Sequence, residues 1–318
     1  MKTKLLVEQH FHGCYGINFN TASLDDVLEL SHKLLKEGIG YIFPTLVTDS
    51  VENIKRQIKI IKEAASKQTY DTAKICGVHL EGIFLNPGKK GIHNDKYFLL
   101  PTVENFKLVE DDFIKIVTLA PELCRGQELI NAGSGFANSG GGLISYLNGR
   151  NLKVQAGHCI GADLTGCSGV THMYNAMSPV AHRKAGTALS ALLNNDIYTE
   201  VIADGIHVSD DALRLLFKIK PMNKILLISD CLPCTGYNSS MPEFYFAGSK
   251  IYYDGEKAVS ADGTIAGSTR LLPDIVKILA QKEMFCKQYI TNSYDYHKLN
   301  PYGEIEWDEE FNIVNVTY

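Results

Sequence analysis

The sequence has no apolar run near the roughly eighteen residues that a membrane-spanning helix needs. It also has no basic run, and its net charge is −5 at pH 7, so it carries no electrostatic footprint for nucleic acid. The opening MKTKLLVEQHFHG holds a short apolar segment, LLV, before Glu8, which is too little for a secretory signal. We therefore expect a cytoplasmic globular protein with no nucleic-acid partner and no membrane partner.

The eight cysteines form no recognisable disulfide framework. They are scattered, and Cys76 and Cys159 lie in apolar strand-like runs, which is typical of reduced thiols in a cytosolic protein. Cys231 and Cys234 form a CxxC pair, but no second CxxC stands at metal-binding spacing. A separate zinc or redox site at this pair is therefore the weaker interpretation.

Short apolar strands alternate with amphipathic helices along the chain, which is the pattern of βα units with a parallel sheet. The first helix is predicted in SLDDVLELSHKLLKEG, with Ser23 as its N-cap and Gly38 at its end. The sequence contains eight strand-like runs: KLLVEQHFHG, IGYIFPTLV, AKICGVHLEG, IKIVTLAPE, KVQAGHC, GVTHMYN, YTEVIADGIHV and KILLISDCL. This α/β pattern predicts a closed, TIM-like (β/α)8 barrel.

The barrel is assigned to residues 1–290. This range includes a hairpin insertion over residues 238–268 and a closing helix in TRLLPDIVKILAQK. Residues 291–318 contain GEIEWDEEFNIVNVTY, which reads as two short strands. We interpret them as a short C-terminal β remnant of an accessory domain.

Polar side chains end most of the predicted strands, at the rim where a barrel builds its chemistry. They are His10, His12, Glu81, His158, His172, Asp204, His207 and Asp230. Because strand interiors are buried, so many imidazoles and carboxylates need solvent or a shared partner. A divalent metal is such a partner, and this nitrogen and oxygen donor set suits Zn²⁺ first, with Fe²⁺, Mn²⁺ or Co²⁺ as alternatives.

Seven motifs occur in order: HLEG, GIHN, GHC, THMYNAM, IADGIHV, SDCLP and ADGTIAGS. This ordered set closely resembles the N-acetylglucosamine-6-phosphate deacetylases of the amidohydrolase superfamily, over about Val7 to Gly267. The resemblance implies a metal-dependent barrel of the amidohydrolase type. It also implies hydrolysis of the N-acetyl group of an amino-sugar phosphate, with release of acetate.

The resemblance assigns roles to single residues. Glu81, His158 and His172 match the metal ligands, and His10 with His12 matches the HxH that supports a second metal in some members, so one or two ions are both open. Asp230 resembles the catalytic aspartate. His93 aligns with a histidine that contacts the substrate near its amide.

The same resemblance places the phosphate of the substrate. Asn175 and Ala176 match positions whose backbone amides approach the phosphate, and Arg183 and His207 match a cationic pair that faces it. In this family the arginine comes from the neighbouring subunit. The resemblance therefore implies a homodimer in which Arg183 reaches a neighbouring active site.

Three departures from the family pattern are visible. Members begin with several β-sandwich strands, whereas Met1 stands almost at the first barrel strand, so we expect half of the accessory domain to be missing. The usual DxHxHG reads EQHFHG, with Glu8 and Gln9, and HLEGPF reads HLEGIF, with Ile83. We expect these two changes to alter the loop at the mouth of the site, and with it the choice of sugar.

Two other functions stay open from the sequence. One is another amidohydrolase reaction, such as cyclic amide hydrolysis or deamination, against which the phosphate-facing pair Arg183 and His207 argues. The other is a non-catalytic sugar-phosphate binding protein, against which Asp230 argues, because binding alone does not need that carboxylate.

Overall fold

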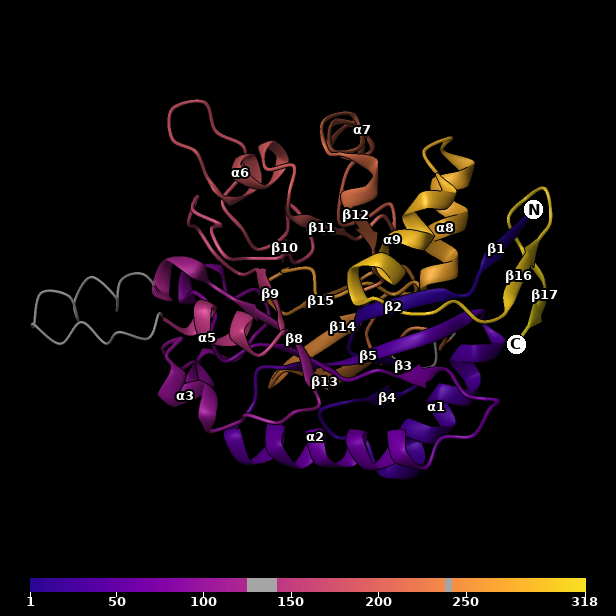
Figure 1. Cartoon of the computed structure of the whole chain (residues 1–318), viewed down its shortest axis with the longest axis horizontal. Coiled ribbons are helices and arrows are strands. Elements are labelled where there is room, and N and C mark those ends of the chain that lie inside the picture. Colours follow the sequence, from indigo (N-terminus) through magenta and orange to yellow (C-terminus); the bar gives the residue numbers. More distant parts are fainter. Residues whose placement is uncertain (125–141, 238–241) are drawn as a thin grey trace, which may run out of the picture.

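The structure is a computed structural model that describes residues 1–124, 142–237 and 242–318 (Figure 1). Within these residues, eight parallel strands pair in the order β2-β5-β7-β8-β9-β10-β11-β12, and the short β6 (Lys74–Ile75) pairs with β5. Their bounds are β2 Leu6–Phe11, β5 Ile39–Val47, β7 Val78–Glu81, β8 Ile114–Leu119, β9 Lys153–Ala156, β10 Gly169–Val170, β11 Tyr198–Val201 and β12 Ile225–Leu227. The predicted barrel is confirmed.

The barrel closes between its first and last strands near their carboxyl ends. The Asp230 N–H donates to the His10 carbonyl at 2.8 Å, and the His12 N–H donates to the Cys231 carbonyl at 2.9 Å. These two backbone bonds hold two neighbouring strand ends together although β2 and β12 form no ladder. They also fix the segments that carry His10, His12 and Asp230 against each other.

Helices surround the strands (Figure 1). Their bounds are α1 Leu24–Lys36, α2 Val51–Ser66, α3 Val103–Lys107, α5 Leu143–Gly149, α6 Thr187–Leu193, α7 Asp210–Ile219, α8 Leu272–Gln281 and α9 Lys287–His297. The predicted N-cap Ser23 is confirmed, because its side chain accepts from the Asp26 N–H and Asp26 accepts from the Ser23 N–H. No helix in the described ranges is long and apolar enough to cross a membrane.

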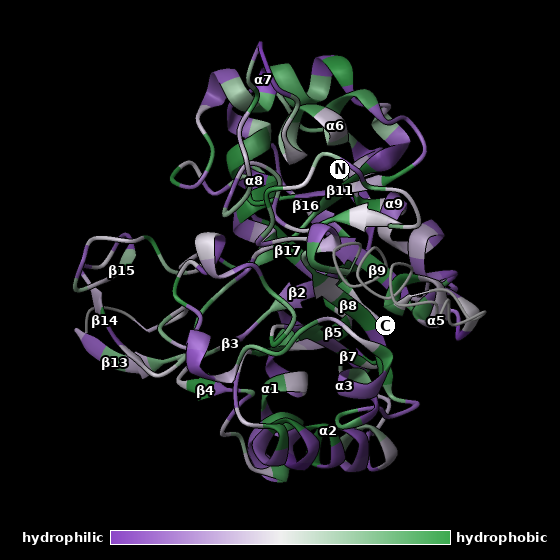
Figure 2. Cartoon of the chain, turned by 90° about the vertical axis from the view of Figure 1, so that its left-hand side faces the viewer, coloured by the Kyte–Doolittle hydropathy of each residue, from purple (hydrophilic) through white to green (hydrophobic). Residues whose placement is uncertain are grey.

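Three small sheets complete the fold. An antiparallel sheet of β13 (Glu243–Phe246), β14 (Ser249–Tyr253) and β15 (Ala258–Ser260) forms the predicted insertion and projects from one side of the barrel (Figure 2). Residues 238–241 of that insertion lie outside the described residues. The strands β3 (Gly13–Cys14) and β4 (Ile17–Asn18) form a tight hairpin.

The two chain ends share the last of these sheets. Strand β1 (Lys2–Lys4) pairs with β16 (Glu304–Trp307), which pairs with β17 (Ile313–Thr317) (Figure 1). The accessory element therefore draws a strand from the N-terminal segment as well as two from the C-terminal one. The assigned boundary at residue 290 falls inside helix α9, which packs on β12 and β2, and the division into 1–290 and 291–318 stays a prediction.

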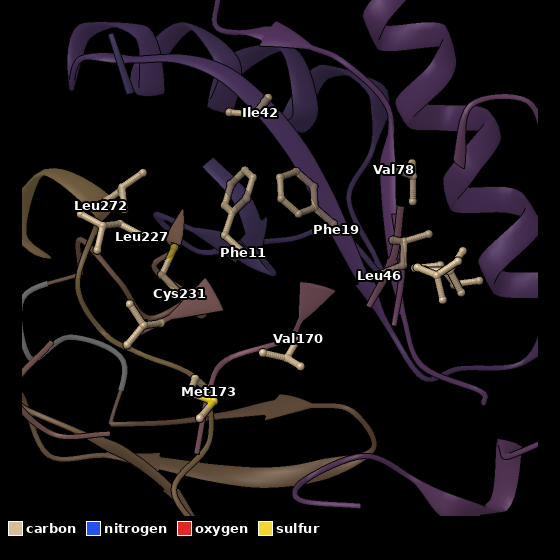
Figure 3. Close-up of a cluster of buried hydrophobic side chains, with 14 of the residues drawn as sticks. Phe11, Phe19, Ile42, Leu46, Val78, Val170, Met173, Leu227, Cys231 and Leu272 are labelled. Carbon is tan, nitrogen blue, oxygen red and sulfur yellow. The ribbon is translucent and has the colours of Figure 1, made fainter. Parts of the chain in front are cut away.

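A buried aromatic pair fixes which side chains of β2 face the barrel interior. The rings of Phe11 and Phe19 meet edge to face with centroids 4.9 Å apart, and neither residue is exposed (Figure 3). Because neighbouring side chains on a strand point to opposite faces, seating Phe11 in this core turns His10 and His12 toward the barrel interior. We expect truncation of such a phenylalanine to cost about 3–5 kcal/mol.

Candidate metal centre and active site

Six of the predicted side chains meet at the carboxyl end of the barrel. They are His10 from β2, His12 just after β2, Glu81 from β7, His158 after β9, His172 after β10 and Asp230 after β12. All six are buried. Side chains at the ends of five strands thus contribute to one cluster.

The Glu81 carboxylate divides this cluster into two groups. Its Oε1 lies 3.0 Å from His172 Nε2 and 3.3 Å from His158 Nε2. Its Oε2 lies 3.2 Å from His10 Nε2 and 3.1 Å from His12 Nε2. Each carboxylate oxygen therefore faces a separate pair of imidazole nitrogens.

Asp230 belongs to the second group. Its Oδ1 lies 3.1 Å from His12 Nε2 and 3.4 Å from His10 Nε2. Although buried, Asp230 Oδ1 and His10 Nε2 make no hydrogen bond within the described part of the chain. Buried polar atoms without partners are rare in folded proteins, and these two converge on one point with further N and O donors, so the residues fit a divalent cation of the zinc type.

The charges of the cluster agree with this fit. Burial alone would raise the pKa of the Glu81 carboxyl, but the charge of His10 and hydrogen bonds from the surrounding histidines hold that pKa well below its usual range. Burial alone would lower the pKa of His12, but Asp230 and Glu81 outweigh it and raise that pKa to about 9. Positive charge next to the buried carboxylates thus stabilises their ionised form, and a bound cation would supply such charge.

The backbone at the cluster is strained. His158 has φ 47°, His172 has φ 27° and Asp230 has φ 53°, in the left-handed region that non-glycine residues seldom adopt. Such conformations cost of order 1–3 kcal/mol each and persist where the surrounding structure imposes them. At these positions the strain turns each side chain from its strand end into the shared cluster.

His93 lies over the cluster on the loop that follows β7. Its Nε2 is 3.7 Å from Glu81 Oε2, and its Nδ1 is 2.8 Å from Thr48 Oγ1. Since Thr48 Oγ1 already accepts from the Ile83 N–H at 3.1 Å, its own hydrogen is available to His93 Nδ1. Burial, with the neighbouring His158, holds the pKa of His93 well below its usual range. The ring is therefore neutral, with its proton on Nε2, which faces the cluster.

A cavity of about 360 Å³ opens above the cluster. This volume suits a small sugar-sized ligand. The cavity is lined by His12, Glu81, Pro87, Gly88, Lys89, Lys90, Gly91, Ile92, His93, His158, His172, Asn175, Ala176, His207, Asp230, Phe246 and Thr264–Gly267. Metal-type donors thus form its floor, and the loop after β7 and the β13–β15 insertion contribute to its walls.

The other predicted residues separate into two sets. Asn175, Ala176 and His207 line the cavity, whereas Arg183 is exposed and lies outside its lining. His207 makes two hydrogen bonds, from Nδ1 to Asp204 Oδ2 at 2.8 Å and from Nε2 to the Ala266 carbonyl at 2.9 Å. Burial alone would lower the pKa of His207, but Asp204 outweighs it and raises that pKa. The His207 cation is therefore part of the cavity wall.

Sequence reasoning missed several residues of the site. Lys89 and Lys90 line the cavity but receive no role from the sequence, although the KKG run before His93 was a usable signal. Phe246 stacks its ring edgewise near His12, with centroids 5.2 Å apart, and nothing in the sequence marked it. We expected Glu8 and Gln9 to act on the loop at the mouth of the active site. Their position does not fit this expectation, because both are buried and neither lines the cavity.

Comparisons with known proteins point in one direction. No family model matches the chain. The N-acetylglucosamine-6-phosphate deacetylase of Bacillus subtilis (strain 168) is 33% identical over 275 residues, which cover 83% of this chain and 65% of that protein. The Haemophilus influenzae protein of the same name is 29% identical over 274 residues, which cover 85% of this chain and 69% of that protein. The chain thus spans about two thirds of the length of these relatives.

A solved structure gives the same picture. The crystal structure of N-acetylglucosamine-6-phosphate deacetylase from Pasteurella multocida matches with a TM-score of 0.85 and 25% sequence identity. The match covers 99% of this chain and 84% of that one. The likeness therefore includes the barrel together with the small sheets at its edge.

Proposed function

Because the chain belongs to the N-acetylglucosamine-6-phosphate deacetylase family, we propose that it hydrolyses the N-acetyl group of a phosphorylated amino sugar and releases acetate. The observation that carries this proposal is the Glu81 carboxylate, set between two pairs of histidines on the floor of a sugar-sized cavity. An unactivated amide needs a strong nucleophile and a polarised carbonyl, which a metal ion held by such a donor set would supply.

The metal is proposed to be Zn²⁺, with Fe²⁺, Mn²⁺ or Co²⁺ as alternatives. Glu81 Oε1, His158 and His172 would hold the first ion. Glu81 Oε2, His10, His12 and Asp230 supply a second set of donors, so we propose room for two ions. A bound ion would lower the pKa of a water molecule to about 7 and polarise the amide carbonyl.

Asp230 is proposed as the general base and acid. Burial would raise the pKa of its carboxyl, but His10 and His12 outweigh burial and keep it ionised, so it can accept a proton. It would take the proton from the attacking water as the new C–O bond forms at the acetyl carbon. It would then deliver that proton to the sugar nitrogen as the C–N bond breaks, leaving acetate and a free amine.

His93 is proposed as the donor to the developing oxyanion. The hydrogen bonds of Thr48 leave the proton of the neutral ring on Nε2, directed toward the cluster. A donor held in this way needs no reorganisation as negative charge grows on the carbonyl oxygen.

The phosphate is proposed to bind at the cationic wall of the cavity, near Asn175, Ala176 and His207, with Lys89 and Lys90 on the facing loop. Arg183 stands exposed on the segment between β10 and α6. Its place supports a homodimer in which Arg183 reaches the active site of the neighbouring subunit. A cytoplasmic location stays a prediction from the sequence.

The test is acetate release by purified protein of measured metal content. Substrates would be N-acetylglucosamine 6-phosphate, N-acetylgalactosamine 6-phosphate and unphosphorylated N-acetylglucosamine. We expect release from a phosphorylated sugar, loss of release with a chelator and recovery with Zn²⁺. No release from metal-replete protein would instead favour another amidohydrolase reaction or a binding role.

A further inference from the structure

Glu200 is a buried carboxylate of the barrel that does not line the cavity. Glu200 on β11 is 0% exposed, and its Oε2 lies 3.0 Å from His10 Nδ1. Its other oxygen, Oε1, accepts from Gln9 Nε2 at 2.6 Å, so both carboxylate oxygens have a partner. Burying a carboxylate is costly unless it is well paired, so the hydrogen-bond partners of Glu200 show which side chains it stabilises.

Glu200 decides which nitrogen of His10 faces the cluster. A carboxylate oxygen accepts hydrogen bonds, so in its 3.0 Å contact with Glu200 Oε2 the His10 Nδ1 atom carries the hydrogen and donates it. When His10 is neutral, its lone pair is then on Nε2. That atom is buried without a hydrogen bond, 3.2 Å from Glu81 Oε2 and 3.4 Å from Asp230 Oδ1.

Two further residues hold Glu200 in place. Gln9 Nε2 donates to Glu200 Oε1 at 2.6 Å, and His297 Nε2 lies 2.9 Å from Gln9 Oε1. Burial holds the pKa of His297 well below its usual range, so the ring is neutral and donates its Nε2 hydrogen to the amide oxygen. This fixes the orientation of the Gln9 amide. A buried chain of hydrogen bonds therefore runs from helix α9 through β2 and β11 to His10.

The first group of donors is oriented separately. His158 Nδ1 donates to the Lys89 carbonyl at 2.8 Å, on the loop after β7. Neither His158 nor His172 makes a hydrogen bond with Glu200 or Gln9 within the residues that the structure describes. The two groups of donors thus share Glu81, but different hydrogen-bond partners orient their histidines.

We propose that Glu200, held by Gln9 and His297, is a positioning residue that directs His10 Nε2 toward a second metal ion. The ion held by Glu81, His158 and His172 does not depend on it. This inference rests on the two-ion site of the proposed function. Hydrogen-bond partners of metal-binding histidines fix the tautomer and ring orientation, and their loss costs about 10- to 100-fold in metal affinity.

The test compares Glu200→Gln with wild-type protein by equilibrium dialysis against Zn²⁺, with elemental analysis of the bound metal. We expect two ions in the wild type, and in the variant one retained ion and a second bound about 10- to 100-fold more weakly. The matched control is Thr199→Val. Thr199 is the buried neighbour of Glu200 on β11, and its hydroxyl has no hydrogen-bond partner. We expect this control to bind both ions as the wild type does.

Two more variants keep the test decisive. If Glu200→Gln does not fold by circular dichroism, Gln9→Leu removes the support without touching His10, and we expect the same selective loss of the second ion. In a His10→Ala background, Glu200→Gln should cause no further loss, because its effect passes through His10.

The outcomes separate this inference from the function on which it rests. Two ions bound with wild-type affinities in both Glu200→Gln and Gln9→Leu would overturn the positioning role and leave the proposed function intact. A wild-type protein that binds one ion, and still releases acetate, would overturn the two-ion site and this inference with it. Equal weakening of both ions would show a general structural role and also overturn the inference.

Discussion

Replacing Thr48 by valine tests the arrangement of His93. The Thr48 hydroxyl accepts from the buried Ile83 N–H at 3.1 Å and lies 2.8 Å from His93 Nδ1. Valine keeps the volume of threonine and removes both interactions. The change therefore leaves a buried donor on Ile83 without its partner and removes the shorter of the two hydrogen bonds to His93 Nδ1, leaving that from the Thr48 N–H at 3.4 Å.

Both losses have a calculable size. An unsatisfied buried N–H costs about 1–3 kcal/mol, so the free energy of unfolding should fall by that amount. Removing a donor to an oxyanion costs about 10²- to 10³-fold in kcat, and because the ring itself remains in Thr48→Val, we expect about a 10- to 100-fold loss. Thr48→Ser keeps the hydroxyl and should lose little of either.

The assay pairs steady-state acetate release with urea unfolding of the same preparations. The expected pattern is a lower kcat for Thr48→Val, with metal content as in the wild type, and nearly normal values for Thr48→Ser. A Thr48→Val enzyme with kcat within about twofold of the wild type would refute the role of Thr48 in orienting His93. A stability loss without a loss of kcat would leave the hydroxyl a purely structural role.

Three other predictions follow from the site. Asp230→Asn should lower kcat by at least about 10²-fold while the protein keeps at least one bound ion per chain; loss of all metal would make Asp230 chiefly a ligand. The His207 pKa is raised by Asp204, so the stability of this pair is full below about pH 6.5 and is lost as pH rises through the folded pKa. Urea unfolding of His207→Gln and wild type should therefore differ most near pH 6 and converge above that pKa; a constant difference would contradict this. Gly82→Ala would place a Cβ 2.4 Å from Thr48 Oγ1 at φ 149°, so we expect a loss of several kcal/mol in the same unfolding assay, and a neutral result would contradict the packing.

The fold was predictable because local signals and the global pattern agree. The helix after the first strand begins at the predicted cap Ser23, whose side chain binds the third helical N–H. The strand lengths were less predictable. The run GVTHMYN gives a strand of only Gly169–Val170, because His172 and Tyr174 adopt positive φ and leave the ladder. AKICGVHLEG likewise splits at Gly77, which has φ 150°, into β6 and β7.

The site was predictable where its residues interrupt apolar strands. Histidines or carboxylates at five strand ends are visible in the sequence because the interior of a buried strand is mostly apolar. Phe246, which contacts His12, comes from an insertion far along the chain, and no local pattern marks which of its aromatic residues faces the cavity. Glu200 was hidden for a different reason. It lies within the strand run YTEVIADGIHV, and its partner His10 is 190 residues away.

The departure at Ile83 shows how the structure changes the meaning of a sequence difference. We expected isoleucine in place of the usual proline to act on the mouth of the site, but Ile83 is 0% exposed. Its φ is 60°, which a proline ring cannot adopt, and its N–H donates to Thr48, which a proline cannot do. The substitution therefore changes the backbone that follows Glu81, the proposed metal ligand, and adds a donor to the hydrogen bonds that orient His93. If this chain differs from its relatives in turnover or in choice of sugar, this buried turn is the place to look first, and Thr48→Val measures how much of the difference passes through it.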